Sequence, residues 1–237
     1  MKQILWLLMP LLLLQPSCSK EKTRQIDSSY KPEIKVSDFS NSTQISNPYF
    51  PAPIGKTHVY EGQTQDGLER VEERRLTTTK TIMGITCIII NFRAYLNGNL
   101  IEEAWDWYGQ DNSGNVWYFG EAVDNYHING TLQDHAGSWE AGMDGAQPGI
   151  IMPANPTVGF AYREEYYFNH AEDEAEITAT GLTITIPLGT YSNCIKTRNW
   201  TDLEPDLNEY KYYAPGVGLI KEENVTDKTE IVLKAIQ

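Results

Sequence analysis

Basic residues are scarce in this sequence. Lys and Arg together number 19 against 32 Asp and Glu, which gives a formal charge of −13 at pH 7. Proteins that bind nucleic acids need clustered Lys and Arg to neutralise the phosphates. The composition therefore excludes nucleic acid as a partner.

Cysteines, long apolar runs and catalytic motifs are also few. Three cysteines in 237 residues are too few for a disulfide-built scaffold. No segment reaches the ~20 apolar residues that a membrane-spanning helix needs. Neither H-E-x-x-H nor G-x-S-x-G occurs, and we therefore predict a protein without enzymatic activity. The four histidines show no metal-ligand spacing, and they are His58, His127, His135 and His170.

The first 17 residues are typical of an export signal. Lys2 precedes the apolar stretch 4–14, which is too short to span a bilayer. The residues that follow end in Ser17 and Cys18, and this junction resembles the lipobox of bacterial lipoproteins. The resemblance implies lipidation of Cys18, and Ser19 directly after it favours the outer membrane. Ordinary secretion with cleavage nearby is the alternative.

Residues 18–46 are predicted to form a flexible tether behind the lipid. The segment is rich in Ser, Lys, Asp and Gln and has few adjacent apolar residues. Such a sequence buries too little surface to offset the entropy of ordering. We expect it to hold the folded domain, residues 47–237, away from the membrane.

The folded domain has the pattern of an all-β protein. Short runs of β-branched and aromatic residues, such as 87–90 and 116–119, are separated by turn residues such as Asn97-Gly98. Residues 177–186 alternate with period two. We predict an antiparallel barrel or a wrapped sheet with little helix.

Landmarks in the first half of this domain recur in the same order in the second half. Examples are Cys87 and Cys194, which each follow a turn, and Trp105 and Tyr210, which each begin an aromatic run. The order indicates two degenerate repeats of about 105 residues. Repeat one is 47–121, the connector 122–154, repeat two 155–223 and a final strand 224–237.

Four segments resemble an uncharacterised group of bacterial exported proteins and lipoproteins with a duplicated β unit. They are NPYFP at 47–51, DWYGQDNSGNVWYFGE at 106–121, GSWEAG at 137–142 and YYAPGVGLIK at 212–221. The hairpin pattern is also similar to the half-open barrels of lipoprotein carriers (LolA/LolB-like). The resemblance implies a fold and an envelope location but no reaction.

Aromatic residues crowd the hairpins and are the candidate ligand-binding residues. On a strand, Trp105 and Trp107 share one face, whereas Asp106 and Tyr108 share the other. One face is expected to be core, and the other to stack on a sugar or hold an acyl chain. The candidates are Trp105, Trp107, Tyr108, Trp117, Trp139 and Tyr212.

One oxygen-rich loop is a candidate Ca²⁺ site. Asp111, Ser113 and Asn115 alternate around Gly114, and Glu121 could complete the set from the next strand. The alternative is an ordinary hairpin turn whose side chains bond their own backbone. No other cofactor is indicated.

Cys87 and Cys194 occupy equivalent places in the two repeats. An exported protein meets an oxidising compartment, and a disulfide between them is one interpretation. The other is that each is a small buried side chain in an apolar strand.

Three functions remain open on this basis. The first is a non-catalytic, membrane-anchored envelope protein that binds an amphipathic or apolar ligand, such as a lipid or glycan. The second is an enzyme acting on envelope polysaccharide through a carboxylate pair. The third is a structural or interaction module. The acids considered for such a pair are Glu140, Asp144, Glu164, Glu165, Glu172, Asp173 and Glu174.

Overall fold

The structure is a computed structural model that describes residues 29–237. The predicted signal peptide and Cys18 lie outside these residues. One short 3-10 turn, Val36–Phe39, precedes the sheet. No helix in the described part of the chain is long and apolar enough to cross a membrane.

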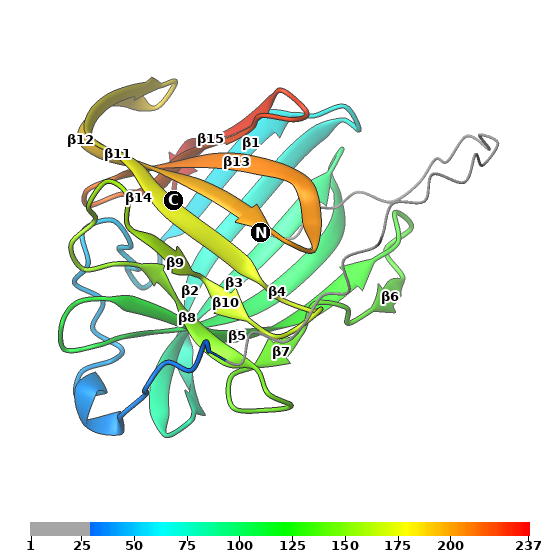
Figure 1. The fold of residues 1–237 in the computed structure, drawn as a ribbon. Helices are drawn as coiled ribbons and strands as arrows, with labels where there is room; N and C mark the ends of the chain where they lie inside the picture. The colour runs from blue at the N-terminus through cyan, green and yellow to red at the C-terminus, as the bar shows by residue number, and fades with distance from the viewer. Residues whose placement is uncertain (1–28) are drawn as a thin grey trace, which may run out of the picture.

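The described chain is all-β, as the sequence predicts, and forms one antiparallel sheet (Figure 1). In chain order the strands are β1 (Thr57–Gln63), β2 (Leu68–Ile82), β3 (Ile85–Leu96), β4 (Asn99–Gln110), β5 (Val116–Tyr126), β6 (Leu132–Asp134), β7 (Trp139–Glu140), β8 (Gln147–Met152), β9 (Ala161–Arg163), β10 (Glu165–Tyr166), β11 (Asp173–Ile186), β12 (Gly189–Thr201), β13 (Glu204–Ala214), β14 (Gly218–Asn224) and β15 (Thr229–Ile236).

Tight turns set the register of the long hairpins. Asn97 and Gly98 both have positive φ, 50° and 83°, and join β3 to β4 through the facing pair Leu96 and Asn99. A turn of this kind matches the right-handed twist of the strands it connects. The Asn97-Gly98 pair therefore forms a hairpin turn, as the sequence predicts.

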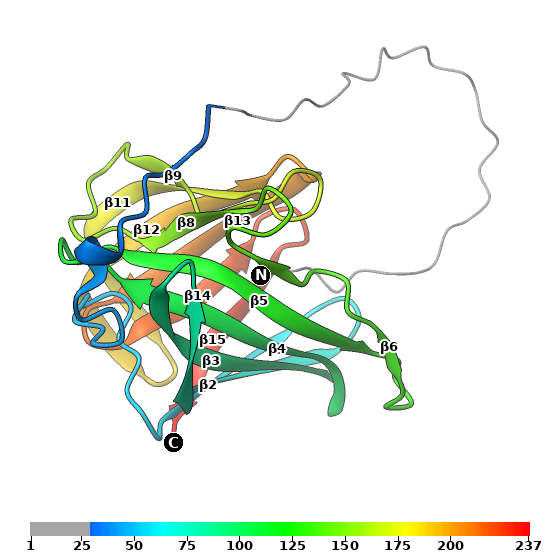
Figure 2. The same cartoon turned by 90° about the horizontal axis from the view of Figure 1, so that it is seen from below.

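The sheet wraps around until its two ends meet. β15 pairs with β1, and the strands run in ladder order from β10 through β8 and β5 to β1, then through β15 to β9. In Figure 1 the strands β11 to β13 arch in front of β1 to β4, and Figure 2 shows the same wrap from below, with β6 projecting from the end of β5. The wrapped-sheet prediction is confirmed, and the sheet is not closed by a ladder.

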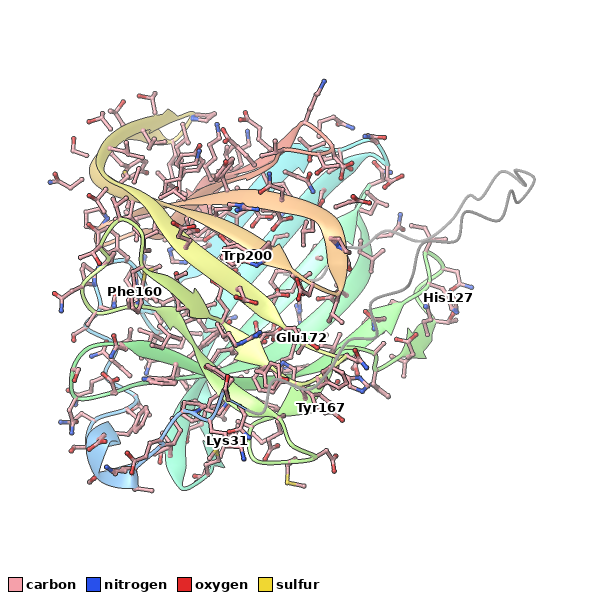
Figure 3. The ribbon with its side chains drawn as sticks, viewed as in Figure 1. Lys31, His127, Phe160, Tyr167, Glu172 and Trp200 are labelled. Atoms are coloured by element: carbon pink, nitrogen blue, oxygen red, sulfur yellow. The ribbon has the colours of Figure 1, made fainter. Side chains whose placement is uncertain are left out.

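One residue bridges the two edges. β9 pairs with β11 and β10 pairs with β8, and only Glu164 separates β9 from β10 in the chain. The Glu164 N–H donates to the carbonyl of Asp173 at 2.8 Å. Glu172 and Tyr167 are labelled beside this junction in Figure 3, whereas His127 lies on the distant hairpin after β5. The two edge strands, β9 and β10, are therefore joined through the backbone at Glu164, although no ladder of hydrogen bonds joins them.

The two four-strand meanders β2–β5 and β11–β14 occupy the places expected for the two repeats. Descent from one duplicated unit stays a prediction. Apolar packing lies in three clusters, centred on Phe119, Leu233 and Ile177. Between the walls of the sheet, acidic, aromatic and aliphatic side chains line the interior together.

Candidate functional site

The wrapped sheet encloses a cavity of about 170 Å³, measured as the space open to the centre of a water molecule. One water needs roughly 10–15 Å³ on this measure, so the cavity has room for a small organic molecule. Its lining comes from both halves of the domain, because the wrap places β2 to β5 opposite β11 to β14.

Seven carboxylates are among the lining residues, together with aromatic and aliphatic side chains. The carboxylates are Glu73, Glu102, Asp106, Glu121, Glu164, Glu165 and Asp173. The basic residues are Lys56, which is exposed, Arg75 and Lys211. Arg75 donates to the carbonyls of Ala52 and Thr43, both at 2.8 Å. Lys211 is thus the basic residue that lies deep among the acids.

One wall is built by β4 and β5. Asp106 and Glu121 are directly opposite each other in the ladder, 9% and 8% exposed. Tyr118 donates its hydroxyl to Asp106 Oδ1 at 3.1 Å. Burial, followed by the nearby Glu121 carboxylate, raises the pKa of Asp106 well above its ordinary value. This wall favours a shared proton or an external cation.

The facing wall is built by β13 and β14. Lys211 and Glu222 are directly opposite each other, 7% and 6% exposed. Burial, followed by Glu209, raises the pKa of Glu222 to about 8. Burial alone would lower the pKa of Lys211, but Glu222 and Glu164 raise it well above its ordinary value. Lys211 therefore keeps its charge.

Glu164, at the junction of the two sheet edges, is held by an amide. Asn199 Nδ2 lies 3.1 Å from both carboxylate oxygens of Glu164, and Thr197 donates to Asn199 Oδ1 at 2.6 Å. Burial raises the pKa of Glu164, which is 3% exposed.

Tyrosine rings cover the space between the carboxylates. Tyr108 and Tyr118 stack with ring centres 4.8 Å apart, and Phe50 packs on Tyr108 at 4.9 Å. Tyr60 and Tyr213 also line the cavity. Aromatic faces attract cations and the apolar faces of sugar rings.

Residues 47–53 cover one end of the cavity. Asn47 Nδ2 donates to the carbonyls of Gly114 and Pro153, and its Oδ1 accepts from the Tyr49 N–H. The Tyr49 hydroxyl donates to the carbonyl of Asn193 at 3.0 Å. This segment therefore ties the β4–β5 turn and the end of β8 to β12 at one end of the cavity.

Of the six predicted ligand-binding aromatics, Tyr108 lines the cavity. Trp107 is buried with the ammonium of Lys80 3.3 Å from its ring centre, and Trp139 is in the same apolar cluster. Trp117 donates to Asp111, and Tyr212 to Glu223. Trp105 is half-buried on the face of β4 opposite to Asp106. These five residues do not line this cavity, and a ligand role for them stays a prediction.

Three of the predicted Ca²⁺ ligands, Asp111, Ser113 and Asn115, lie in one turn, but the fourth, Glu121, does not. Asp111 accepts from the backbone N–H groups of Ser113 and Asn115 and from the side chains of Asn115 and Trp117. Glu121 faces the cavity instead. In the described part of the chain no cluster of His, Cys, Asp and Glu fits a metal ion. The hairpin-turn alternative accounts for the loop.

Cys87 and Cys194 are free thiols, so the disulfide interpretation is corrected. They are fully buried in two different apolar clusters, Cys87 on β3 and Cys194 on β12. Each therefore behaves as a small core side chain.

Sequence reasoning considered Glu164, Glu165 and Asp173 only as candidates for a catalytic carboxylate pair, and the structure places all three at the cavity. It gave no role to Lys211, Tyr60 or Glu73. One signal in the sequence could have indicated an interior with charged residues. In strands such as 68–75, charged side chains occur on both faces, and one face of a strand in a wrapped sheet points inward.

Comparison with known proteins gives one match. No protein-family model matches this chain. A search of curated proteins also found no match. Among solved structures, a chain described as a "putative lipoprotein from Parabacteroides distasonis ATCC 8503" aligns with a TM-score of 0.41 and 13% sequence identity, over 81% of this chain and 99% of that chain. A similarity of this size identifies neither a family nor a ligand.

Proposed function

We propose that this chain is a binding protein whose wrapped sheet holds a small organic cation in its interior cavity. The observation that carries the proposal is the buried carboxylate of Asp106, which lines the cavity beside the stacked rings of Tyr108 and Tyr118 and accepts a hydrogen bond from Tyr118. A buried carboxylate is costly unless it is protonated or paired with a positive charge. A ligand ammonium supplies a positive charge at Asp106, and the tyrosine rings add cation–π attraction.

The same lining argues against a wholly apolar ligand. A lipid chain would place apolar groups against the Asp106 carboxylate, whereas an amphipathic cation suits both this acid and the tyrosine rings. Binding is expected to displace protons from carboxylates with a raised pKa, such as Asp106.

Calorimetric titration with cyclohexylammonium tests the proposal, with cyclohexanol as the neutral probe of similar shape. We expect cyclohexylammonium to bind and cyclohexanol to bind at least tenfold more weakly, with net proton release shown by buffers of different ionisation enthalpy. Asp106→Asn should weaken the binding. Glu33→Gln is the matched control, because Glu33 is exposed at the surface and the charge change is the same. Equal affinity for the two probes would refute the proposal.

A second candidate function is glycoside cleavage. It is favoured by one observation, namely that Asp106, with a raised pKa, lies directly opposite a second carboxylate, Glu121. A protonated acid beside a carboxylate is the pair used by glycoside hydrolases. Release of reducing sugar from envelope polysaccharide, lost in Asp106→Asn, would support this candidate, and no release would remove it.

We further propose that a lipid on Cys18 anchors the domain in the bacterial envelope, at the outer membrane. The apolar stretch 4–14 and the lipobox-like junction support this location. A binding domain held there by a tether can sample small molecules next to the membrane.

A further inference from the structure

Lys211 is a buried ammonium that faces the cavity. It lies on β13, is 7% exposed and belongs to the lining. An ammonium has three N–H donors. No residue in the described range 29–237 accepts a hydrogen bond from Lys211 or forms an ion pair with it. The Lys211 nitrogen is not one of the fully buried polar atoms without a hydrogen bond, so it is reached from the cavity rather than sealed in the core.

The neighbouring acids balance the charge of Lys211 without using its donors. Glu164 is held by Asn199, which approaches both of its oxygens, and Asn199 is itself oriented by Thr197. Glu222 has one carboxylate oxygen, Oε2, that is buried and without a hydrogen bond. The donors of Lys211 are therefore available to a molecule inside the cavity.

The opposite wall offers the complementary chemistry. Within residues 29–237, Asp106 accepts one hydrogen bond, from Tyr118, and forms no ion pair with a basic side chain. Tyr108 and Tyr118 stand beside it as stacked rings. An ammonium is favoured at this wall, whereas Lys211 on the other wall requires an oxygen acceptor.

The acceptor at Lys211 is a neutral oxygen. Glu164 and Glu222 lie near enough to Lys211 to act on its charge. A ligand carboxylate or phosphate placed there would add a further acidic group beside Glu164 and Glu222, whose pKa values burial already raises. A hydroxyl group, in contrast, accepts from the ammonium and donates to a carboxylate at the same time.

We propose that Lys211 donates to a hydroxyl oxygen of the bound molecule, and that the ligand is an amino sugar, with its ammonium at Asp106 and its hydroxyl groups at Lys211. This inference rests on the proposed binding of a cation. A sugar ring also presents an apolar face, which suits the tyrosines.

Three probes separate this inference from the proposed function, each titrated into the full chain solubilised in detergent. Glucosamine carries an ammonium and hydroxyls, cyclohexylammonium the ammonium alone, and glucose the hydroxyls alone. A hydrogen bond to a charged group is expected to contribute on the order of 10- to 100-fold in affinity. Glucosamine should bind more tightly than cyclohexylammonium by that factor.

Lys211→Met gives the decisive comparison. It should remove the advantage of glucosamine, whereas cyclohexylammonium should bind as well as before or better, because a positive charge has left the cavity. Lys211→Arg is the second variant. It keeps the charge and moves the donors, and it should reduce the ratio of glucosamine to cyclohexylammonium affinity. It serves as the test if Lys211→Met does not fold.

Each outcome is informative. If cyclohexylammonium binds but glucosamine has no advantage, or if the advantage survives in both Lys211 variants, the amino-sugar inference is overturned and the proposed function stands. If neither ammonium probe binds, the proposed function fails with it. If glucose binds as tightly as glucosamine, the ammonium subsite at Asp106 is wrong.

Discussion

Lys211 and Glu222 lie directly opposite each other on β13 and β14, and Asp106 and Glu121 lie directly opposite each other on β4 and β5. One wall thus pairs a base with an acid, and the other pairs two acids. Because all four side chains are less than one-tenth exposed, the interior has a negative side and a compensated side. A ligand that enters is oriented by this difference.

Replacing Glu222 should change how stability depends on pH. Burial and Glu209 raise the pKa of Glu222 to about 8, above its ordinary value of 4.5. Between these two pKa values the folded state binds more protons than the unfolded state. The protonated Glu222 therefore stabilises the fold at low pH, and this stabilisation is lost as the pH rises through the pKa of the folded state. Urea unfolding should show wild-type stability falling between about pH 5 and about pH 8, and Glu222→Gln should flatten the fall by at least about 1 kcal/mol. The same slope in both proteins would contradict the assignment, and Glu33→Gln is the control.

Gly149→Ala should open the junction of the two sheet edges. A Cβ at Gly149 on β8 would overlap the backbone of Arg163 and Glu164, although the backbone conformation itself suits alanine. We expect a loss of about 1–3 kcal/mol or more in unfolding free energy, measured with urea. Gly109→Ala is the matched control, because its Cβ would meet only side chains, at 3.3 Å and beyond. Equal effects of the two substitutions would mean that the edges are not in close contact.

Asn47→Ala should loosen the cover over the cavity mouth. Asn47 is 4% exposed and makes hydrogen bonds to Gly114, Pro153 and Tyr49. Its removal leaves buried backbone groups unpaired, which costs about 1–3 kcal/mol each. Thermal unfolding should show a clear decrease, whereas Asn41→Ala, at an exposed position, should change stability by less than about 0.5 kcal/mol. An unchanged melting temperature for Asn47→Ala would show that the segment is not anchored this way.

Both core thiols should be unreactive in the native protein. Burial raises the pKa of Cys87 to about 12, and Cys194 is fully buried. A thiol reagent should therefore modify Cys87 and Cys194 only after unfolding, without prior reduction. Intact-mass analysis after non-reducing unfolding in alkylating reagent reads this directly, and failure to alkylate would restore the disulfide.

Cys18→Ala should release the protein from the membrane. A lipid on Cys18 is the predicted anchor, and several acyl chains hold a protein stably on a bilayer. After fractionation of cells, the wild type is expected with the membranes and the variant in soluble fractions. Ser17→Ala, which keeps a small residue before the cysteine, is the control and should remain membrane-bound. An unlipidated mass for the wild type would favour ordinary secretion.

The sequence carried the alternation of β4 correctly. The face that holds Asp106 and Tyr108 is the one that lines the cavity, and Trp105 and Trp107 are on the other face, as period two requires. The alternation did not say which face would be inside, since both carry large aromatic rings. Ligand roles were therefore predicted for residues such as Trp139 and Tyr212, which do not line this cavity.

The role of Lys211 could not be predicted from the sequence at all. Its neighbours in the sequence are tyrosines, and nothing local sets it apart from an exposed lysine. It becomes distinctive because Glu164, distant along the chain, and Glu222, on the next strand, are brought to it. Pairings of this kind depend on strand order around the wrap.

By itself the sequence determined the all-β class, the hairpin turns and the faces of the strands, because these follow from residues close together in the chain. It also determined the acidity of the protein. Tertiary structure alone decided that the acids gather in an enclosed space, that Cys87 and Cys194 are kept apart, and that Glu121 belongs to the cavity rather than to a metal loop. The physical reason is that burial raises the cost of charge, and burial depends on contacts between segments that the sequence does not place side by side.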